Sequence, residues 1–190
     1  MARPRSFDSG AVLDKAKAVF WAKGYEGSSI SELAAATGLK TGSLYNAFGD
    51  KHALYLKALD RYGEKEVAAA VAWIARQDCR GAEAVAGFLK MIAAQVESGA
   101  YSDGCFLCNA AADQAAHDPV IAARVSANMA PLRQVFLDRL KGDPRTAEAS
   151  AILADFALAT YLGMFVMIRG GADGPMIRRA VSVAGAALSV

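Results

Sequence analysis

Two short helical patterns joined by a glycine turn, within residues 29–48, restrict the fold of this chain more than any other feature. The segment "SISELAAATG" places Ser29 and Glu32 at the spacing of a capping box, which predicts a helix that ends just before Gly38. The next segment, "TGSLYNAF", predicts another short helix with Thr41 as its N-cap. The sequence therefore predicts two short helices that meet at a tight turn.

A longer helix precedes this pair and gives it a surface to pack on. Residues 11–23 place apolar side chains on one stripe with lysines opposite, and Gly24 then predicts the end of the helix. The stripe consists of Val12, Leu13, Ala16, Val19 and Phe20. The pair is expected to close a small core against it with Leu33, Ala34, Leu39, Leu44 and Phe48. Two short helices joined by a tight turn and braced by a longer one form a helix-turn-helix.

The second helix of the pair carries side chains that suit nucleic acid. Its N-terminal part is expected to expose donors and acceptors that can reach base edges or phosphates: Lys40, Thr41, Ser43, Tyr45 and Asn46. Lys51 starts the following helix, where its charge and the free backbone N–H groups can both face a phosphate. A core position for Tyr45 and a purely solvated Lys51 are the structural alternatives.

The distribution of charge agrees with a polyanion partner. Residues 1–65 hold ten Lys/Arg against seven Asp/Glu, a net charge of +3, whereas residues 66–190 hold eleven against twelve, a net charge of −1. The excess starts with Arg3 and Arg5. A modestly basic end on a nearly neutral body is typical of a polyanion-binding module attached to a second unit.

The stretch "AVFWAKGYEGSSISELAAATGLKTGSLYNAFGDKHAL" resembles the DNA-binding domain of the TetR family of bacterial transcriptional regulators. The resemblance covers about residues 11–56 and includes the Gly-Tyr pair after the first helix and the Leu-Tyr-x-x-Phe-x-x-Lys run. It implies a recognition helix near residues 41–47 and basic contacts from the N-terminal arm. It also implies phosphate contacts from Ser29, Tyr45 and Lys51. Lys40, Thr41 and Ala47 differ from the residues that the family often has at these positions.

Helical patterns continue beyond the match with short breaks. They cover about residues 51–77, with Gly63 as a possible kink, and about 82–97, Gly104 to His117, 119–141, 146–168 and 175–188. The chain is therefore expected to be all-α, with about nine helices. We assign residues 1–56 to the helix-turn-helix domain and residues 57–190 to a C-terminal helical domain. The resemblance implies that the C-terminal domain binds a ligand and forms the dimer.

The last two helices predict a homodimer. The segment "AILADFALATYLGMFVMI" is too apolar for an exposed face, and "AVSVAGAALSV" is rich in small residues that let helices pack closely. A two-fold interface of four helices buries both, and two helix-turn-helix units then read a palindromic operator. The first segment is near the length of a membrane span, but Asp155 interrupts it, so we expect a helix buried on most sides by protein and no membrane partner.

A small apolar or amphipathic effector is a further expectation from the resemblance. Side chains between the middle helices that can line a cavity are Phe88, Met91, Ile92, Phe136, Tyr161, Met164 and Phe165, and the alternative for each is plain core. Asn109 and Asp113 can offer polar contacts to a ligand or order the core as a hydrogen-bonded pair. No cofactor is expected, and the effector's identity does not follow from the sequence.

The cysteines form a CxxC motif in "GCFLCN" and a separate site at Cys79. A zinc site lacks further ligands of suitable spacing, and a thioredoxin-like catalyst needs a βαβ setting, so no metal is expected. Two alternatives remain: Cys105 and Cys108 are core or cavity residues, or they sense oxidants or electrophiles, with Cys105 in the first turn of a helix that lowers its pKa. Cys79 lies between arginines and is a second candidate for a reactive thiol.

The function expected from these features is that of a homodimeric DNA-binding repressor, released from its operator by an effector. A regulator that senses thiol chemistry through Cys105 and Cys108 is the alternative. An enzyme is not expected, because His52 lies inside the helix-turn-helix match and His117 at a helix end, which leaves no catalytic base. An odd number of cysteines and a start without an apolar run after its arginines indicate a cytoplasmic protein.

Overall fold

The computed structural model describes residues 7–101 and 103–188, and these residues form an all-helical fold. At one end lie α1 (Ser9–Lys23), α2 (Ile30–Thr37) and α3 (Thr41–Phe48). The remaining elements are α4 (Lys51–Tyr62), the π-helical turn η1 (Gly63–Val67), α5 (Ala68–Ala75), α6 (Gly81–Glu97), α7 (Phe106–Asp113), α8 (Pro119–Lys141), α9 (Ser150–Arg169) and α10 (Gly174–Leu188). Because α4, η1 and α5 follow one another without a break, the described residues form nine continuous helices, as expected.

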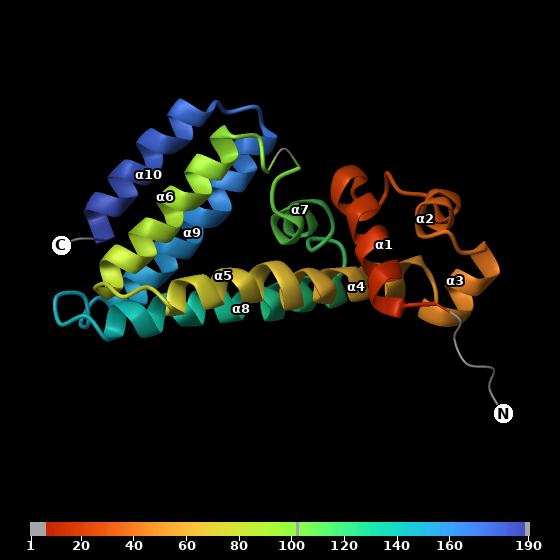
Figure 1. The fold of residues 1–190 in the computed structure, drawn as a ribbon, viewed down its shortest axis with the longest axis horizontal. Helices are drawn as coiled ribbons and strands as arrows, with labels where there is room; N and C mark the ends of the chain where they lie inside the picture. The colour runs from red at the N-terminus through yellow and green to blue at the C-terminus, as the bar shows by residue number, and fades with distance from the viewer. Residues whose placement is uncertain (1–6, 102, 189–190) are drawn as a thin grey trace.

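Two long helices, α4–η1–α5 and α8, connect two groups of helices. Figure 1 shows α1, α2 and α3 at one end, α6, α9 and α10 at the other, and the α4–η1–α5 helix running beside α8 between them. The short helix α7 lies in the middle, between α1 and the C-terminal group (Figure 1). One cluster of buried apolar side chains extends through both groups.

Two helices of the N-terminal group end at the glycines expected from the sequence, and α2 begins at the expected capping box. Ser29 accepts a hydrogen bond from the backbone N–H of Glu32, and the Glu32 side chain accepts one from the Ser29 backbone, so the capping box is complete. Gly24 ends α1 with φ +73° and Gly38 ends α2 with φ +77°, a conformation that favours glycine. The prediction that Thr41 is the N-cap of α3 is wrong. Lys40 is the N-cap, and Thr41 is the first helical residue.

One further helix end differs from the prediction, and the long helix is irregular at Gly63. The chain passes there into the π-helical turn η1, where an added Cβ would lie 1.9 Å from Oδ1 of Asn128 in α8. A larger residue at this position would therefore have to displace the Asn128 side chain. The helix expected from Gly104 to about His117 covers only Phe106–Asp113, and Cys105 is its N-cap and not a residue of its first turn.

Candidate nucleic-acid interface

Helix α3 presents a polar face to solvent. Leu44 and Phe48 are buried on its inner side. The predicted contact residues Lys40, Thr41, Ser43, Tyr45 and Asn46 are all exposed on the other side. Tyr45 is 44% exposed, so it is not a core aromatic. The structure thus brings these five side chains together on one accessible face of the size that enters a major groove.

Ser29 lies at the start of α2 and is also exposed, but its hydroxyl already has partners. Its Oγ lies 2.9 Å from Oε2 of Glu32 and 2.9 Å from Oγ of Ser31. A hydrogen bond from Lys23, followed by bonds from Ser29, lowers the pKa of Glu32 to about 2. A phosphate contact by the Ser29 side chain therefore has to compete with a carboxylate that is charged at neutral pH.

Lys51 is held by an aromatic ring beside the start of α4. Its Nζ atom lies 4.4 Å from the centre of the Tyr25 ring, within cation–π distance. Tyr25 in turn contacts the rings of Phe20, at 6.3 Å between centres, and Tyr55, at 5.0 Å. Lys51 is therefore neither fully solvated nor free: the ring of Tyr25, which packs against Phe20 of α1 and Tyr55 of α4, holds it at the helix terminus. Two other candidate contacts, Arg3 and Arg5, lie outside the described residues.

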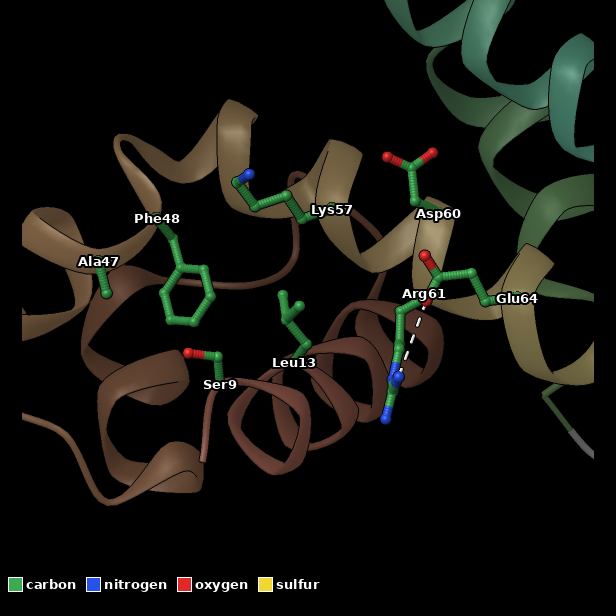
Figure 2. A pocket seen from close by; sticks show the side chains of 8 residues that line it. All are labelled: Ser9, Leu13, Ala47, Phe48, Lys57, Asp60, Arg61 and Glu64. Atoms are coloured by element: carbon green, nitrogen blue, oxygen red, sulfur yellow. Dashed lines mark ion pairs between the residues drawn. The ribbon is translucent and has the colours of Figure 1, made fainter. Parts of the chain in front are cut away.

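A cleft of about 390 Å³ opens between α1 and α4, next to the end of α3 (Figure 2). Its charged lining comes from the continuous helix of α4 and η1 and consists of Lys57, Asp60, Arg61 and Glu64, of which Arg61 pairs with Glu64 at 3.7 Å. Because the positive side chains are matched by carboxylates, the cleft offers no excess charge for a phosphate. We do not include it in the interface.

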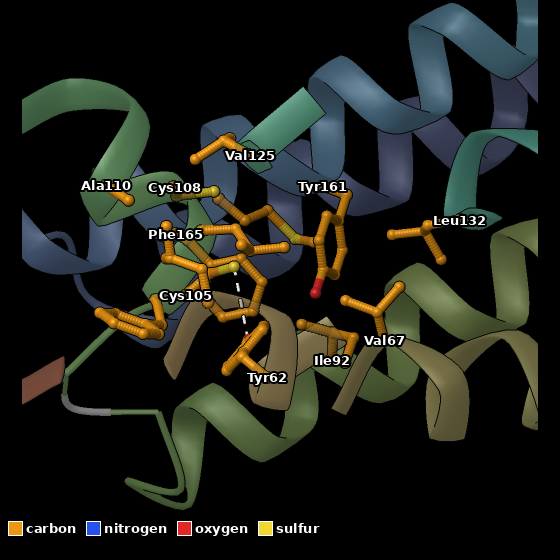
Figure 3. Packing of buried hydrophobic residues seen from close by; sticks show 14 of the residues in the cluster. Tyr62, Val67, Ile92, Cys105, Cys108, Ala110, Val125, Leu132, Tyr161 and Phe165 are labelled. Atoms are coloured by element: carbon orange, nitrogen blue, oxygen red, sulfur yellow. Dashed lines mark hydrogen bonds between the residues drawn. The ribbon is translucent and has the colours of Figure 1, made fainter. Parts of the chain in front are cut away.

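Gly104 and Cys105, which we call the cysteine turn, precede α7 and contact side chains of α1 and α4. Cys105 and Cys108 are both buried, and the Tyr62 hydroxyl donates a hydrogen bond of 3.4 Å to Sγ of Cys105 (Figure 3). The hydrogen bond with Cys108, then those from Tyr62 and from backbone N–H groups, lowers the pKa of the Cys105 thiol, although burial opposes this. The same pair raises the pKa of Cys108. Cys79 is exposed. Among the described residues there is no group of three or more His, Cys, Asp or Glu side chains that can hold a metal ion.

The residues expected to bind an effector form part of the packed core. Phe88, Phe136, Tyr161, Met164 and Phe165 are at most 7% exposed. Rings of Phe88 and Tyr161 stack with centres 5.6 Å apart, and those of Tyr161 and Phe165 meet edge-on at 5.0 Å. Ile92 is buried with them, and Met91 is partly buried against the cluster (Figure 3 shows Ile92, Tyr161 and Phe165). Side chains fill this region, so an effector has to displace them.

Asn109 and Asp113, the two polar candidates of α7, have separate partners. The side-chain amide of buried Asn109 donates to the carbonyl oxygen of Asp103 at 2.8 Å. Asp113 lies 3.7 Å from Nη1 of Arg169 in α9. Asn109 thus orders the turn before α7, whereas Asp113 ties the end of α7 to α9.

Helices α9 and α10 each leave an apolar face uncovered. On α9, Ile152 is 74% exposed, Phe156 40% and Val166 59%. On α10, Met176 is 46% and Val183 71% exposed. Within the described residues α9 is the one helix long and apolar enough to cross a membrane by length and composition, and 28% of its most apolar window is buried. The single chain therefore does not bury α9 on most sides, and the expectation that protein covers this helix stays a prediction that includes a dimer partner.

Sequence patterns did not reveal several contacts between elements far apart in the chain. His52 of α4 lies 2.8 Å from a carboxylate oxygen of Asp118, the N-cap of α8. Lys17 is buried in α1 and pairs with Glu66 of η1. The expectation that the lysines of the first helix lie opposite its apolar stripe is therefore wrong for Lys17. Its position four residues after Leu13 and three before Phe20 was the available signal, because lysines are rarely buried without a partner.

Comparison with known proteins gives two family matches that together cover most of the chain. Residues 12–58 match the model of bacterial regulatory proteins of the tetR family. Residues 81–182 match the model of the C-terminal domain of LmrA/YxaF-like transcriptional regulators.

Individual relatives agree with these matches. The HTH-type transcriptional regulator YezE of Bacillus subtilis is 30% identical over 165 residues, which cover 85% of this chain and 84% of YezE. The HTH-type transcriptional repressor ComR of Escherichia coli is 37% identical over 107 residues, 56% of this chain and about half of ComR (51%).

Solved structures share the fold. A cysteine-substituted variant of the TetR family regulator CifR, in complex with double-stranded operator DNA of 26 base pairs, superposes with a TM-score of 0.83 at 26% identity. The superposition covers 97% of this chain and 99% of that one. A TetR regulator from Chloroflexus aurantiacus has a TM-score of 0.77 at 24% identity, covers 94% of this chain and 92% of its own, and shows the fold alone.

Proposed function

Since the chain belongs to the TetR family of bacterial transcriptional regulators, we propose that it is a homodimeric repressor that leaves a palindromic operator when a small apolar or amphipathic effector binds. That it is a DNA-binding regulator follows from the family. The homodimer, the operator symmetry, the effector, the cytoplasmic location and the division of the chain at residues 56 and 57 belong to the proposal.

One observation supports the DNA-binding role most directly, namely the exposed polar face of α3 next to the start of α4. In this role Lys40, Thr41, Ser43 and Asn46 reach base edges, because they lie on the accessible side of α3. Tyr45 and Lys51 contact phosphates on either side, and Ser29, Arg3 and Arg5 add backbone contacts.

The uncovered faces of α9 and α10 support the homodimer. The exposed positions Ile152, Phe156 and Val166 recur at helical spacing along α9, and Met176 and Val183 do so along α10. Two such faces related by a two-fold axis bury each other in a four-helix interface. The dimer then sets the two α3 helices about one turn of DNA apart, at roughly 34–36 Å.

The proposed effector site lies at the aromatic cluster of α6, α8 and α9, whose side chains are apolar. A ligand that enters between Phe88, Tyr161 and Phe165 has to separate rings that now contact each other. Unbranched methionines such as Met91 and Met164 repack at low cost, which allows a cavity to open there. Cys105 and Asn109 lie on the α7 side of this region and offer polar contacts.

A thiol-sensing regulator is a second candidate, and the Tyr62–Cys105 hydrogen bond favours it. A thiol with a lowered pKa is more often the reactive thiolate, and Cys108 lies close enough to act as its resolving partner. Under this proposal Cys105→Ser abolishes the response to diamide or methylglyoxal and leaves operator binding intact. An unchanged response of the Cys105→Ser variant excludes sensing at this thiol.

The main proposal is tested by selecting duplexes from a random library with the purified protein, then footprinting the enriched sequence. We expect an inverted repeat, a 2:1 protein-to-duplex ratio and an affinity that falls steeply with added salt. Failure to enrich any duplex contradicts the DNA-binding role, and a 1:1 complex on a single half-site contradicts the dimer. Native mass spectrometry of freshly purified protein reports the dimer and any retained ligand together.

A further inference from the structure

Five aromatic side chains form a continuous cluster between the cysteine turn and Lys51. They come from α1, the loop after it, α4 and α7: Trp21, Tyr25, Tyr55, Tyr62 and Phe106. We call these five residues the aromatic bridge. Phe106 directly follows Cys105 in the chain, and Lys51 sits over the ring of Tyr25, so the two ends of the bridge are the thiol and the DNA-facing lysine.

Most ring contacts of the bridge are edge-on, and Trp21 and Phe106 meet at a tilt, so the rings have little room for independent movement. The ring of Tyr55 lies 5.6 Å from that of Phe106 and 5.0 Å from that of Tyr25, centre to centre. Tyr55 and Phe106 are each 1% exposed. Because close-packed interiors deform little, a displacement of Phe106 is passed on to Tyr55 and Tyr25.

Trp21 attaches α1 directly to the cysteine turn. Its indole Nε1–H donates a hydrogen bond of 3.2 Å to the carbonyl oxygen of Gly104, and its ring meets that of Tyr62 edge-on at 5.2 Å. Gly104 has φ +72°, so the backbone at the acceptor adopts a conformation that favours glycine. The first helix of the DNA-binding group therefore holds the residue just before Cys105.

Tyr62 supplies the contact of α4 with the same turn. Its hydroxyl donates to Sγ of Cys105, and it is the last residue of α4 before the π-helical turn. Gly104 and Cys105 are thus held by α1 through Trp21 and by α4 through Tyr62. Gly104 and Cys105 of the effector domain thus contact α1 of the DNA-binding group and the C-terminal end of α4, the helix in which the proposed domain boundary lies.

We propose that the aromatic bridge couples the cysteine turn to DNA binding, with Trp21 as the positioning residue that sets the geometry of the turn and, through the bridge, of Lys51. This inference rests on the proposed DNA-binding role, and it deepens that role by giving α1 a direct connection to the effector domain beside the one through α4. Linkage then requires the reverse effect: operator binding stabilises the turn and protects Cys105.

A variant with a single tryptophan tests the bridge by fluorescence. The chain has two tryptophans, and Trp73 of α5 packs against Phe88, outside the bridge. In Trp73→Phe the emission therefore comes from Trp21 alone. We expect it to change on addition of the selected operator duplex, along the same isotherm as binding followed by anisotropy of the labelled DNA. An unchanged Trp21 emission at saturating operator contradicts the coupling.

Alkylation of Cys105 tests the coupling from the other end. Labelling by N-ethylmaleimide is followed by peptide mass spectrometry, which separates Cys105 from exposed Cys79. Operator DNA is expected to slow labelling of Cys105 by about fivefold or more in the wild type, the lower range of typical allosteric couplings. In Trp21→Phe, which keeps a ring but loses the N–H donor, we expect less than about twofold protection, whereas Trp73→Phe retains the full effect.

The outcomes separate this inference from the proposed function. A protein that enriches no duplex contradicts the DNA-binding role before coupling is measured. A protein that binds its operator but protects Cys105 equally in wild type and Trp21→Phe overturns the role of Trp21. If Trp21→Phe does not fold, as judged by circular dichroism, the fluorescence experiment decides, because it leaves Trp21 in place.

Discussion

The Nζ atom of Lys51 lies 4.4 Å above the ring of Tyr25, and this pair connects the loop after α1 to the start of α4. The contact could not be predicted from a local sequence pattern, since 26 positions separate the two residues. The contact fixes a flexible cation where a DNA phosphate is expected to bind, so less side-chain entropy remains to be lost on binding.

Replacing Lys51 with alanine is expected to weaken operator binding and flatten its salt dependence. Each lost phosphate contact lowers the slope of log K against log [salt] by about 0.9, hence by about 1.8 for a dimer. Tyr25→Leu is expected to weaken binding by about two- to fivefold, the range of an exposed cation–π contact, while Tyr25→Phe keeps the ring and stays near wild type. Anisotropy titrations at several salt concentrations measure both effects; equal affinities of the Leu and Phe variants contradict the pairing.

Substitutions of Asn46 and Tyr45 are expected to have different effects: the first on sequence preference and the second on overall affinity for DNA. An amide that reads adenine discriminates against the wrong base by about 1–3 kcal/mol, so Asn46→Ala should relax the preference at one operator position. Tyr45→Phe removes a hydroxyl from a phosphate contact and should lower affinity for all duplexes alike. Repeating the duplex selection with each variant distinguishes them. A shifted preference in Tyr45→Phe, with none in Asn46→Ala, would reverse the assignment.

The variant Val166→Asp tests whether the uncovered face of α9 forms the dimer interface. In Val166→Asp two like charges face each other in the proposed dimer, which is expected to give monomers in sedimentation at micromolar concentration and a loss of more than about tenfold in operator affinity. Val120→Asp is the matched control, because Val120 is 49% exposed against 59% for Val166 but lies on α8. A dimeric Val166→Asp protein shows that another surface forms the dimer.

The variant Asp14→Asn tests how much the ionic contacts between α1 and the helix of α4 and η1 contribute to the free energy of unfolding. Its carboxylate accepts hydrogen bonds from Arg61, at 3.0 Å and 3.1 Å, and from Lys65, at 2.7 Å. The hydrogen bond from Arg61 is the largest effect and lowers the pKa of Asp14 well below its ordinary value. At neutral pH, Asp14→Asn is expected to reduce the free energy of unfolding by about 1 kcal/mol, a value reduced for partial exposure to solvent.

The pH dependence of this effect has a defined sign. Because the pKa is lower in the folded protein, the stabilisation is complete above the unfolded value of about 3.9 and is lost as the pH falls through the folded value. Urea unfolding at pH 7, 5 and 3 should show a constant difference between wild type and variant at the first two and a smaller one at pH 3. The exposed control Glu148→Gln should stay within about 0.5 kcal/mol of wild type at pH 7.

The helices of the N-terminal group could be predicted because their signals are local. The capping box of Ser29 and Glu32 and the glycines at positions 24 and 38 act within one or two turns of the chain. The exposed face of α3 follows from the same periodicity, because Leu44 and Phe48 occupy its inner side. Thr41 failed as a cap because Lys40 already has the extended backbone of an N-cap, φ −67° and ψ 147°.

An all-helical chain, the helix-turn-helix and its polar face could thus be predicted from local patterns, since helical period and end signals depend on neighbours within a few residues. The three-dimensional packing added which side chains meet between distant segments: Trp21 with Gly104, Tyr62 with Cys105, and Lys17 with Glu66. It also decided that α9 keeps an apolar face uncovered. These contacts join residues 43 to 83 positions apart, and their partners are selected by packing, which no local pattern encodes.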